Sequence, residues 1–271
     1  MNYKNEILNR GFFVVSNFLT SEETECLAND FRQGSQSDNK VYTLGIANPA
    51  NIEPLHPRIK KILDEISTGG EFTPRVIRGG AFFAIENGIN FPWHQDHESY
   101  FINQSHWNYI NLYIPVIKPV QGKTNLSIVP ADNFQKLDEN LWKKLQGRGA
   151  TSAIREGGKT CIRDDHAGGF LGEFDAELKE IAETPQLNAG DALFMRGDLF
   201  HQTEDTDTER VAVSIRIWNE QDIVTRAHFE TSCPAKEWYK QQNPRVYGKL
   251  AEVFEQKAEM TLGELISAAY Q

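Results

Sequence analysis

The feature that most constrains the fold is a series of short segments rich in β-branched and aromatic residues. They are residues 75–86, 108–116, 124–129, 187–196 and 210–218. Their length and composition are typical of strands, and the glycine, proline, asparagine and aspartate residues between them are typical of turns. Because few helical segments intervene, the pattern favours a mainly β fold with flanking helices (α+β), either an antiparallel barrel or a double-sheet jelly roll.

Shorter elements are expected before this region. Residues 11–15 form an apolar run suited to a buried strand. Thr20 and Glu23 have the spacing of a capping box, in which each side chain bonds a backbone N–H at the start of a helix. This helix is expected to reach Gly34. A second packing helix is predicted over residues 57–66, whose isoleucines and leucine repeat at helical spacing.

The sequence shows no internal repeat and no linker that would divide it, so residues 1–271 are expected to form one domain. Residues 146–172 stand out because they hold seven glycines and many charges. We interpret this segment as too flexible for a core element, hence a disordered insertion or a mobile lid over the barrel mouth. Within it, residues 164–166 (Asp-Asp-His) are interpreted as a solvated charge run. Residues 234–271 are expected to form a helical C-terminal extension, with an apolar stripe of Val246, Leu250, Val253 and Phe254.

Composition narrows the possible partners. The 38 acidic and 28 basic residues give a net charge of −10, and an acidic surface repels phosphate backbones, so no nucleic-acid partner is expected. No apolar run approaches the roughly 18 residues that span a bilayer, and the first ten residues lack the apolar centre of a signal peptide. Three distant cysteines without a CxxC pair are typical of reduced thiols. We therefore expect a cytoplasmic protein without membrane attachment; the sequence leaves its oligomeric state open.

The first candidate for chemistry lies within residues 92–97. Side chains two residues apart on a strand point the same way, so His94 and Asp96 could bind one metal ion. A chain of this composition contains such a pair by chance often enough that the motif alone is a weak signal.

A second group of residues strengthens the indication of a metal site. His201 follows an apolar strand and a short loop, and Arg210 and Arg216 share one face of the last predicted strand. A buried guanidinium needs an anionic partner. Two histidines and a carboxylate leave several positions of an octahedral Fe(II) open, and a nearby arginine can hold a dicarboxylate by a bidentate fork. The alternative is that the histidines are ordinary and the arginines pair with structural acids.

The order of these motifs resembles the phytanoyl-CoA dioxygenase family of Fe(II)/2-oxoglutarate oxygenases over most of the chain. Residues 10–20 are similar to the family's N-terminal strand and helix, and residues 93–96 (Trp-His-Gln-Asp) to its metal motif. Residues 109–116 and 122–130 are similar to its middle strands, and residues 190–201 with Arg210 to its distal ligand and co-substrate arginine.

The chain departs from the family's pattern at two places. Residues 130–133 read Pro-Ala-Asp-Asn where the family usually has Pro-Gly-Ser-His. The nine-residue gap from His201 to Arg210 is slightly short, so the loop is trimmed or Arg216 takes part of the role of Arg210.

The resemblance implies a double-stranded β-helix core of the jelly-roll, cupin-like kind, and a set of site residues. It implies that His94, Asp96 and His201 bind Fe(II), with 2-oxoglutarate as co-substrate and O2 as oxidant. Arg210 would bind the distal carboxylate of 2-oxoglutarate, assisted by Thr203. Further candidates are Tyr113 and Asn111 for the co-substrate, where barrel packing is the alternative, and, for the substrate, Arg216, Trp93, His97, Arg78 and Trp218, with Arg75 the weakest.

The activity that the resemblance implies is hydroxylation of an unactivated C–H bond of a small metabolite, an amino acid or natural-product intermediate, with release of succinate and CO2. Family halogenases carry Ala or Gly in place of the carboxylate, so Asp96 disfavours halogenation. Two alternatives remain open. One is desaturation or cyclisation on the same scaffold, and the other is a non-catalytic jelly-roll protein that binds a metal or small molecule.

Overall fold

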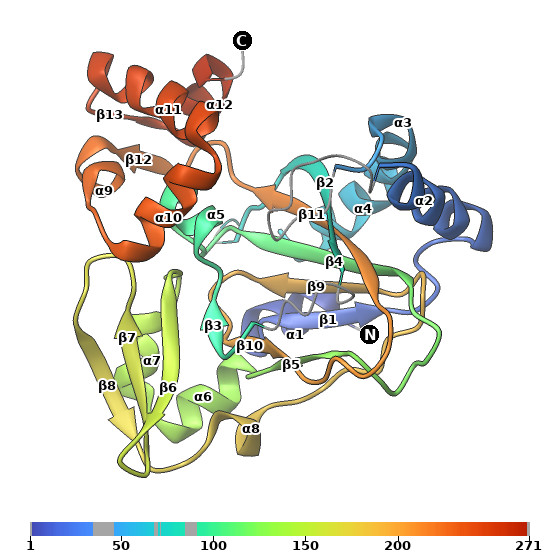
Figure 1. The fold of residues 1–271 in the computed structure, drawn as a ribbon, viewed down its shortest axis with the longest axis horizontal. Coiled ribbons are helices and arrows are strands. Elements are labelled where there is room, and N and C mark those ends of the chain that lie inside the picture. Colours follow the sequence, from blue (N-terminus) through green and yellow to red (C-terminus); the bar gives the residue numbers. More distant parts are fainter. Residues whose placement is uncertain (1, 35–45, 68–69, 71, 85–90, 270–271) are drawn as a thin grey trace.

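The computed structural model describes residues 2–34, 46–67, 70, 72–84 and 91–269, and its centre is a pair of antiparallel sheets (Figure 1). The first sheet has the order β1 (Phe12–Val15), β9 (Ala192–Arg196), β4 (Ile110–Ile117), β11 (Val211–Trp218) and β2 (Val76–Ala84). The second has the order β5 (Leu126–Ile128), β10 (His201–Thr203), β3 (His94–Gln95), β6 (Thr151–Glu156), β7 (Lys159–Asp164) and β8 (Phe170–Phe174). Two sheets facing each other with flanking helices form a jelly roll, which confirms the expected fold class.

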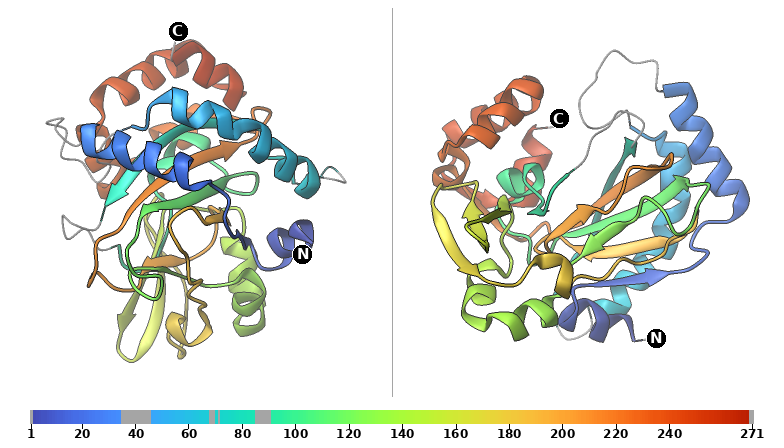
Figure 2. Two further views of the ribbon diagram at one scale, coloured as in Figure 1. Left: turned by 90° about the vertical axis from the view of Figure 1, so that its right-hand side faces the viewer. Right: turned by 60° about the horizontal axis from the view of Figure 1, so that its bottom comes forward.

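The N-terminal helices cover the outer face of the first sheet (Figure 2). They are α1 (Tyr3–Asn9), α2 (Ser21–Gly34), α3 (Pro49–Ile52) and α4 (His56–Ile66), with a 3-10 turn at Glu53–Leu55. The predicted capping box is confirmed, because Thr20 Oγ1 accepts from Glu23 N at 3.1 Å and Glu23 Oε2 accepts from Thr20 N at 2.8 Å. The apolar faces of α2 and α4 pack on the sheet, burying Leu27, Phe31, Ile59, Leu63 and Ile66.

The space between the two sheets holds a second apolar cluster. Leu193 and Met195 enter it from the first sheet, and Ile128 and Ile162 from the second. One end is closed by α6 (Ala131–Leu137) and α7 (Glu139–Leu145), and α8 (Leu178–Ile181) lies beside them. The segment that departs from the family's Pro-Gly-Ser-His therefore contributes the first residues of α6.

The C-terminal region packs as a separate apolar cluster beside the sheets, at the upper left of Figure 1. Its helices are α9 (Arg226–Glu230), α10 (Pro234–Gln242), α11 (Pro244–Gln256) and α12 (Leu262–Ala269), with the strand pair β12 (Ile223–Thr225) and β13 (Glu259–Thr261). Leu250 and Phe254 of the predicted stripe are buried, and Val246 and Val253 pack against them partly buried. No described helix is long and apolar enough to cross a membrane.

The glycine-rich segment differs from the prediction, because residues 146–172 supply β6, β7 and part of β8. The interpretation of this segment as too flexible for a core element is wrong, because its strands belong to the second sheet. Its glycines serve turns: Gly157 and Gly158 join β6 to β7 with φ of +57° and +84°, the left-handed region that glycine tolerates. Between the turns, Thr151 and Ile162 are fully buried. Motion of this segment on substrate binding stays a prediction.

The acidic run inside this segment also differs from its interpretation as solvated. Asp164 is buried, pairs with Arg148 at 2.5 Å and accepts the backbone N–H groups of His166 and Ala167. The carboxylate thereby caps the turn that follows β7. His166 is buried as well and stacks on His228 of α9, with ring centroids 3.9 Å apart.

Candidate active site

A cavity of about 780 Å³ opens between the two sheets and the C-terminal helices, a size typical of small-molecule sites. Strands β2, β4 and β11 supply one wall and β3, β5, β6 and β10 the other. Twelve of the thirteen residues proposed from the sequence line it, namely Arg78, Trp93, His94, Asp96, His97, Asn111, Tyr113, His201, Thr203, Arg210, Arg216 and Trp218.

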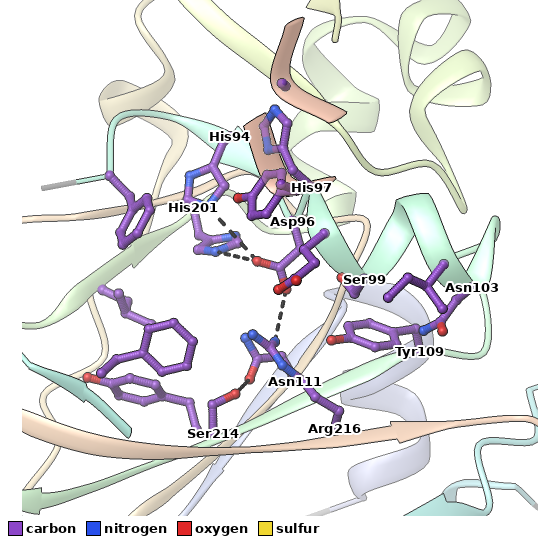
Figure 3. Close-up of a pocket in the computed structure, with 18 of the residues that line it drawn as sticks. His94, Asp96, His97, Ser99, Asn103, Tyr109, Asn111, His201, Ser214 and Arg216 are labelled. Carbon is purple, nitrogen blue, oxygen red and sulfur yellow. Dashed lines mark hydrogen bonds and ion pairs between the residues drawn. The ribbon is translucent and has the colours of Figure 1, made fainter. Parts of the chain in front are cut away.

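His94, Asp96 and His201 meet at the centre of this cavity. His94 on β3 and His201 on β10 are direct register partners, and Asp96 follows β3 (Figure 3). Asp96 Oδ1 lies 3.6 Å from His201 Nε2 and 3.9 Å from His94 Nε2, and the three candidate ligand atoms all lie within 4.8 Å of one another. Three ligands on one side leave the other coordination positions of a metal ion open.

The ring orientation of both histidines suits metal binding. His94 Nδ1 lies 2.7 Å from Pro92 O, and His201 Nδ1 lies 3.1 Å from Leu199 O. A carbonyl oxygen only accepts, so Nδ1 carries the proton in each ring and Nε2 presents its lone pair toward Asp96. Burial, with a smaller contribution from His201, lowers the pKa of His94 to about 3, which keeps this imidazole neutral.

Arg216 fixes the carboxylate of Asp96. Its Nη1 donates to Asp96 Oδ2 at 3.1 Å, on the side away from the histidines (Figure 3). Burial by itself raises the pKa of this carboxyl, but Arg216, and then the two histidines, outweigh burial and hold it below its usual value. Arg216 therefore pairs with a carboxylate of the protein itself, which is the alternative to ligand binding that the sequence left open.

The end of the cavity near β5 contains a buried charge without an anionic partner. Arg210 is 4% exposed and Tyr113 is 5% exposed, and the guanidinium carbon lies 5.5 Å from the Tyr113 ring centroid. Within the described part of the chain, the one hydrogen bond of Arg210 is from Nη1 to the Thr124 carbonyl oxygen, at 3.4 Å. Among the described residues no carboxylate lies within ion-pair distance of Arg210, and Arg210 Nε and the Tyr113 hydroxyl are buried without hydrogen-bond partners. Such groups are costly unless a ligand supplies the acceptors.

Thr203 and Asn111 also line the cavity, and both are buried. Thr203 follows His201 by two residues on β10, so both side chains point inward. The carbonyl oxygen of Asn111 accepts from Ser214 Oγ at 2.6 Å, a cross-strand bond between β4 and β11 (Figure 3). Asn111 is therefore held by the neighbouring strand.

His97 has a partner that the sequence did not suggest. Its Nε2 lies 3.0 Å from Asp165 Oδ2, in the turn after β7, and both residues line the cavity. Asp165 was assigned to a solvated run, but strand pairing of β6 with β3 brings the turn to the cavity.

The remaining substrate candidates differ in position. Trp93 packs partly buried against the cluster between the sheets, and Trp218 is buried at the boundary with the C-terminal helices. Arg78 is exposed on β2 directly opposite Arg216, whereas Arg75, which precedes β2, is exposed and does not line the cavity. Sequence reasoning missed the C-terminal contribution, since no motif marks the cavity residues Ala235, Trp238, Tyr239 and Ile266.

No protein-family model matches the sequence, and no curated protein matches it either. Solved structures match by shape. A prolyl-4-hydroxylase of Pseudomonas putida aligns with a TM-score of 0.50 at 10% identity, over 80% of this chain and 97% of that one. The epimerase SnoN from nogalamycin biosynthesis, in complex with Fe3+, alpha ketoglutarate and nogalamycin RO, aligns at 0.51 and 14%, over 81% and 83%. EvdO2 from Micromonospora carbonacea var. aurantiaca, complexed with 2-oxoglutarate, aligns at 0.52 and 15%, over 79% and 89%. The chain therefore has the fold that these three proteins share.

Proposed function

We propose that this protein is an Fe(II)- and 2-oxoglutarate-dependent oxygenase, similar to the phytanoyl-CoA dioxygenase family, that hydroxylates an unactivated C–H bond of a small metabolite. The observation that carries the proposal is the buried Arg210, which has no carboxylate partner among the described residues and lies in the same cavity as the His94–Asp96–His201 group. A group of metal-binding side chains alone is common, but a buried guanidinium to which the described residues offer no carboxylate favours an anionic ligand in the same cavity. SnoN and EvdO2, whose structures contain 2-oxoglutarate, support the choice of that anion.

The residues present fit the iron and the co-substrate. His94 and His201 would bind Fe(II) through Nε2, since their Nδ1 protons are held by backbone carbonyls, and Asp96 through Oδ1. Arg210 would take the distal carboxylate of 2-oxoglutarate, and the Tyr113 hydroxyl and Thr203 would complete its hydrogen bonds. Bound iron with 2-oxoglutarate and O2 supplies the oxidation of a C–H bond, with release of succinate and CO2.

The protein's own part is to bind, orient and exclude water. Arg216 holds Asp96 Oδ2, so that Oδ1, the oxygen nearer His201, would be the one left to bind the metal. The presence of this carboxylate favours hydroxylation over halogenation. The apolar cover from the C-terminal helices shields the reacting centre from solvent, which limits side reactions.

Succinate formation tests the proposal. The protein with Fe(II), 2-oxoglutarate and O2 is expected to release succinate, faster when a panel of small metabolites contains the substrate. His201→Ala and Asp96→Ala should abolish this release while keeping the fold, because these residues line a cavity rather than fill a core. His56→Ala, at the start of α4 on the outer face of the first sheet, is the matched control and should retain it. Full succinate release by His201→Ala would refute the metal assignment.

The mass of the product separates the possible reactions. Hydroxylation adds one oxygen atom to the substrate, whereas desaturation or cyclisation removes two hydrogen atoms. A folded protein that binds metal but never forms succinate would support the non-catalytic alternative.

A further inference from the structure

The part of the cavity beyond the metal group contains two arginine side chains on neighbouring strands. Arg78 on β2 and Arg216 on β11 are direct register partners, and both side chains face the cavity. Like charges opposite one another across two strands are destabilising. Asp96 compensates Arg216, whereas among the described residues no carboxylate lies within ion-pair distance of Arg78. An anion bound at Arg78 would remove this unbalanced charge.

The surface next to Arg78 is apolar and aromatic. Trp218 lies on the same face of β11 as Arg216, two residues further along, and so is diagonal to Arg78. The C-terminal helices add the opposite side of the wall, with Ala235, Trp238 and Tyr239 from α10 and Ile266 from α12. Trp238 is 45% exposed, a large aromatic side chain left partly uncovered at the cavity rim. Aromatic surface of this kind binds flat or apolar ligand groups.

The charges around the cavity limit how much negative charge a ligand can carry. Glu98 and Asp165 also line the cavity, so a dianionic group such as phosphate would meet two further acidic side chains there. A single carboxylate matches the planar fork of one arginine.

From this arrangement we propose that the substrate is a carboxylic acid with an apolar, aromatic-compatible body. Its carboxylate binds Arg78, and its body lies against Trp218, Trp238 and Tyr239, which places the intervening carbon atoms next to the metal group. This inference rests on the proposed function, because it names the substrate of that reaction. The binding preference itself can be measured without any turnover.

Matched probes test the preference. The carboxylates are phenylacetate, 3-phenylpropionate and 4-phenylbutyrate, and each is compared with its neutral amide. Dissociation constants are measured by tryptophan fluorescence and calorimetry on the Mn(II)-loaded protein, with and without saturating 2-oxoglutarate. The saturated sample keeps the probes away from Arg210, and the sample without co-substrate remains informative if the proposed function fails.

We expect at least one carboxylate to bind about tenfold more tightly than its amide, the discrimination that one charge-assisted hydrogen bond provides. Arg78→Gln should abolish this difference, and Arg75→Gln, the exposed arginine outside the cavity, should keep it. Trp238→Ala should weaken acid and amide equally. Equal binding of acid and amide, a preference that survives Arg78→Gln, or no saturable binding by any carboxylate would overturn the inference. Failure of the proposed function would appear separately, as 2-oxoglutarate that does not bind.

Discussion

Replacing Arg210 with methionine separates a ligand-binding charge from a structural one. Methionine retains apolar length but removes the guanidinium of a residue that is 4% exposed and whose one hydrogen bond among the described residues goes to the Thr124 carbonyl oxygen at 3.4 Å. Losing one partner of a buried charge pair costs about 2–5 kcal/mol. The dissociation constant of 2-oxoglutarate should therefore rise by roughly 30- to 4000-fold, since about 1.4 kcal/mol is a factor of ten.

The same substitution should leave the protein without ligand as stable as before, or more stable. Arg210 has no anionic partner among the described residues, so its removal relieves an uncompensated buried charge. An arginine that pairs with a carboxylate of the protein would behave in the opposite way, because its loss would leave that carboxylate without a partner.

Thermal unfolding of the Mn(II)-loaded protein checks both parts. Saturation with 2-oxoglutarate at about one hundred times its dissociation constant should stabilise the parent by about 2.7 kcal/mol. Arg210→Met should lose most of this gain at the same concentration, whereas Arg163→Met, an exposed arginine on β7, should keep it. A variant that is destabilised without ligand and still binds 2-oxoglutarate normally would refute the reasoning.

Three further predictions concern stability and metal binding. Asp198→Asn should lower the free energy of unfolding in urea by about 3–5 kcal/mol, because it leaves the buried guanidinium of Arg196 without its anion. A loss below about 1 kcal/mol would contradict this. Gly149→Ala should weaken Mn(II) binding measured by calorimetry, since a Cβ would lie 2.7 Å from the backbone oxygen of Asp96; unchanged affinity would show that the loop yields freely. Burial lowers the pKa of His166 to about 4 and of His228 to about 3, so the unfolded chain binds more protons below pH 6.5. Stability should be highest above pH 6.5 and fall as the pH drops toward 4, and replacing both histidines with glutamine should flatten that slope.

The parts of the site that could be predicted from the sequence depend on local spacing. His94 and Asp96 share a side of the chain because they are two residues apart, and Arg210 and Arg216 share a strand face. The capping box at Thr20 is local in the same sense and has the expected bonds.

The parts that could not be predicted depend on contacts between distant segments. Strand β6 belongs to the second sheet because it pairs with β3, and its glycine-rich flanks gave no strand signal. Asp165 becomes a cavity residue only through that pairing, 68 residues from His97. Arg216 reaches Asp96 across 120 residues, and Trp238 of α10 lines the cavity from the C-terminal region.

The most direct test of the central claim is visible absorption of the Fe(II)-loaded protein titrated with 2-oxoglutarate without oxygen. A 2-oxo acid that chelates Fe(II) through its keto and carboxylate oxygens gives a charge-transfer band, and the measurement requires no knowledge of the substrate. We predict a saturable band in the parent protein, a band shifted to much higher co-substrate concentration in Arg210→Met, and none in His201→Ala. A folded parent protein without the band, or a His201→Ala variant that retains it, would contradict the account.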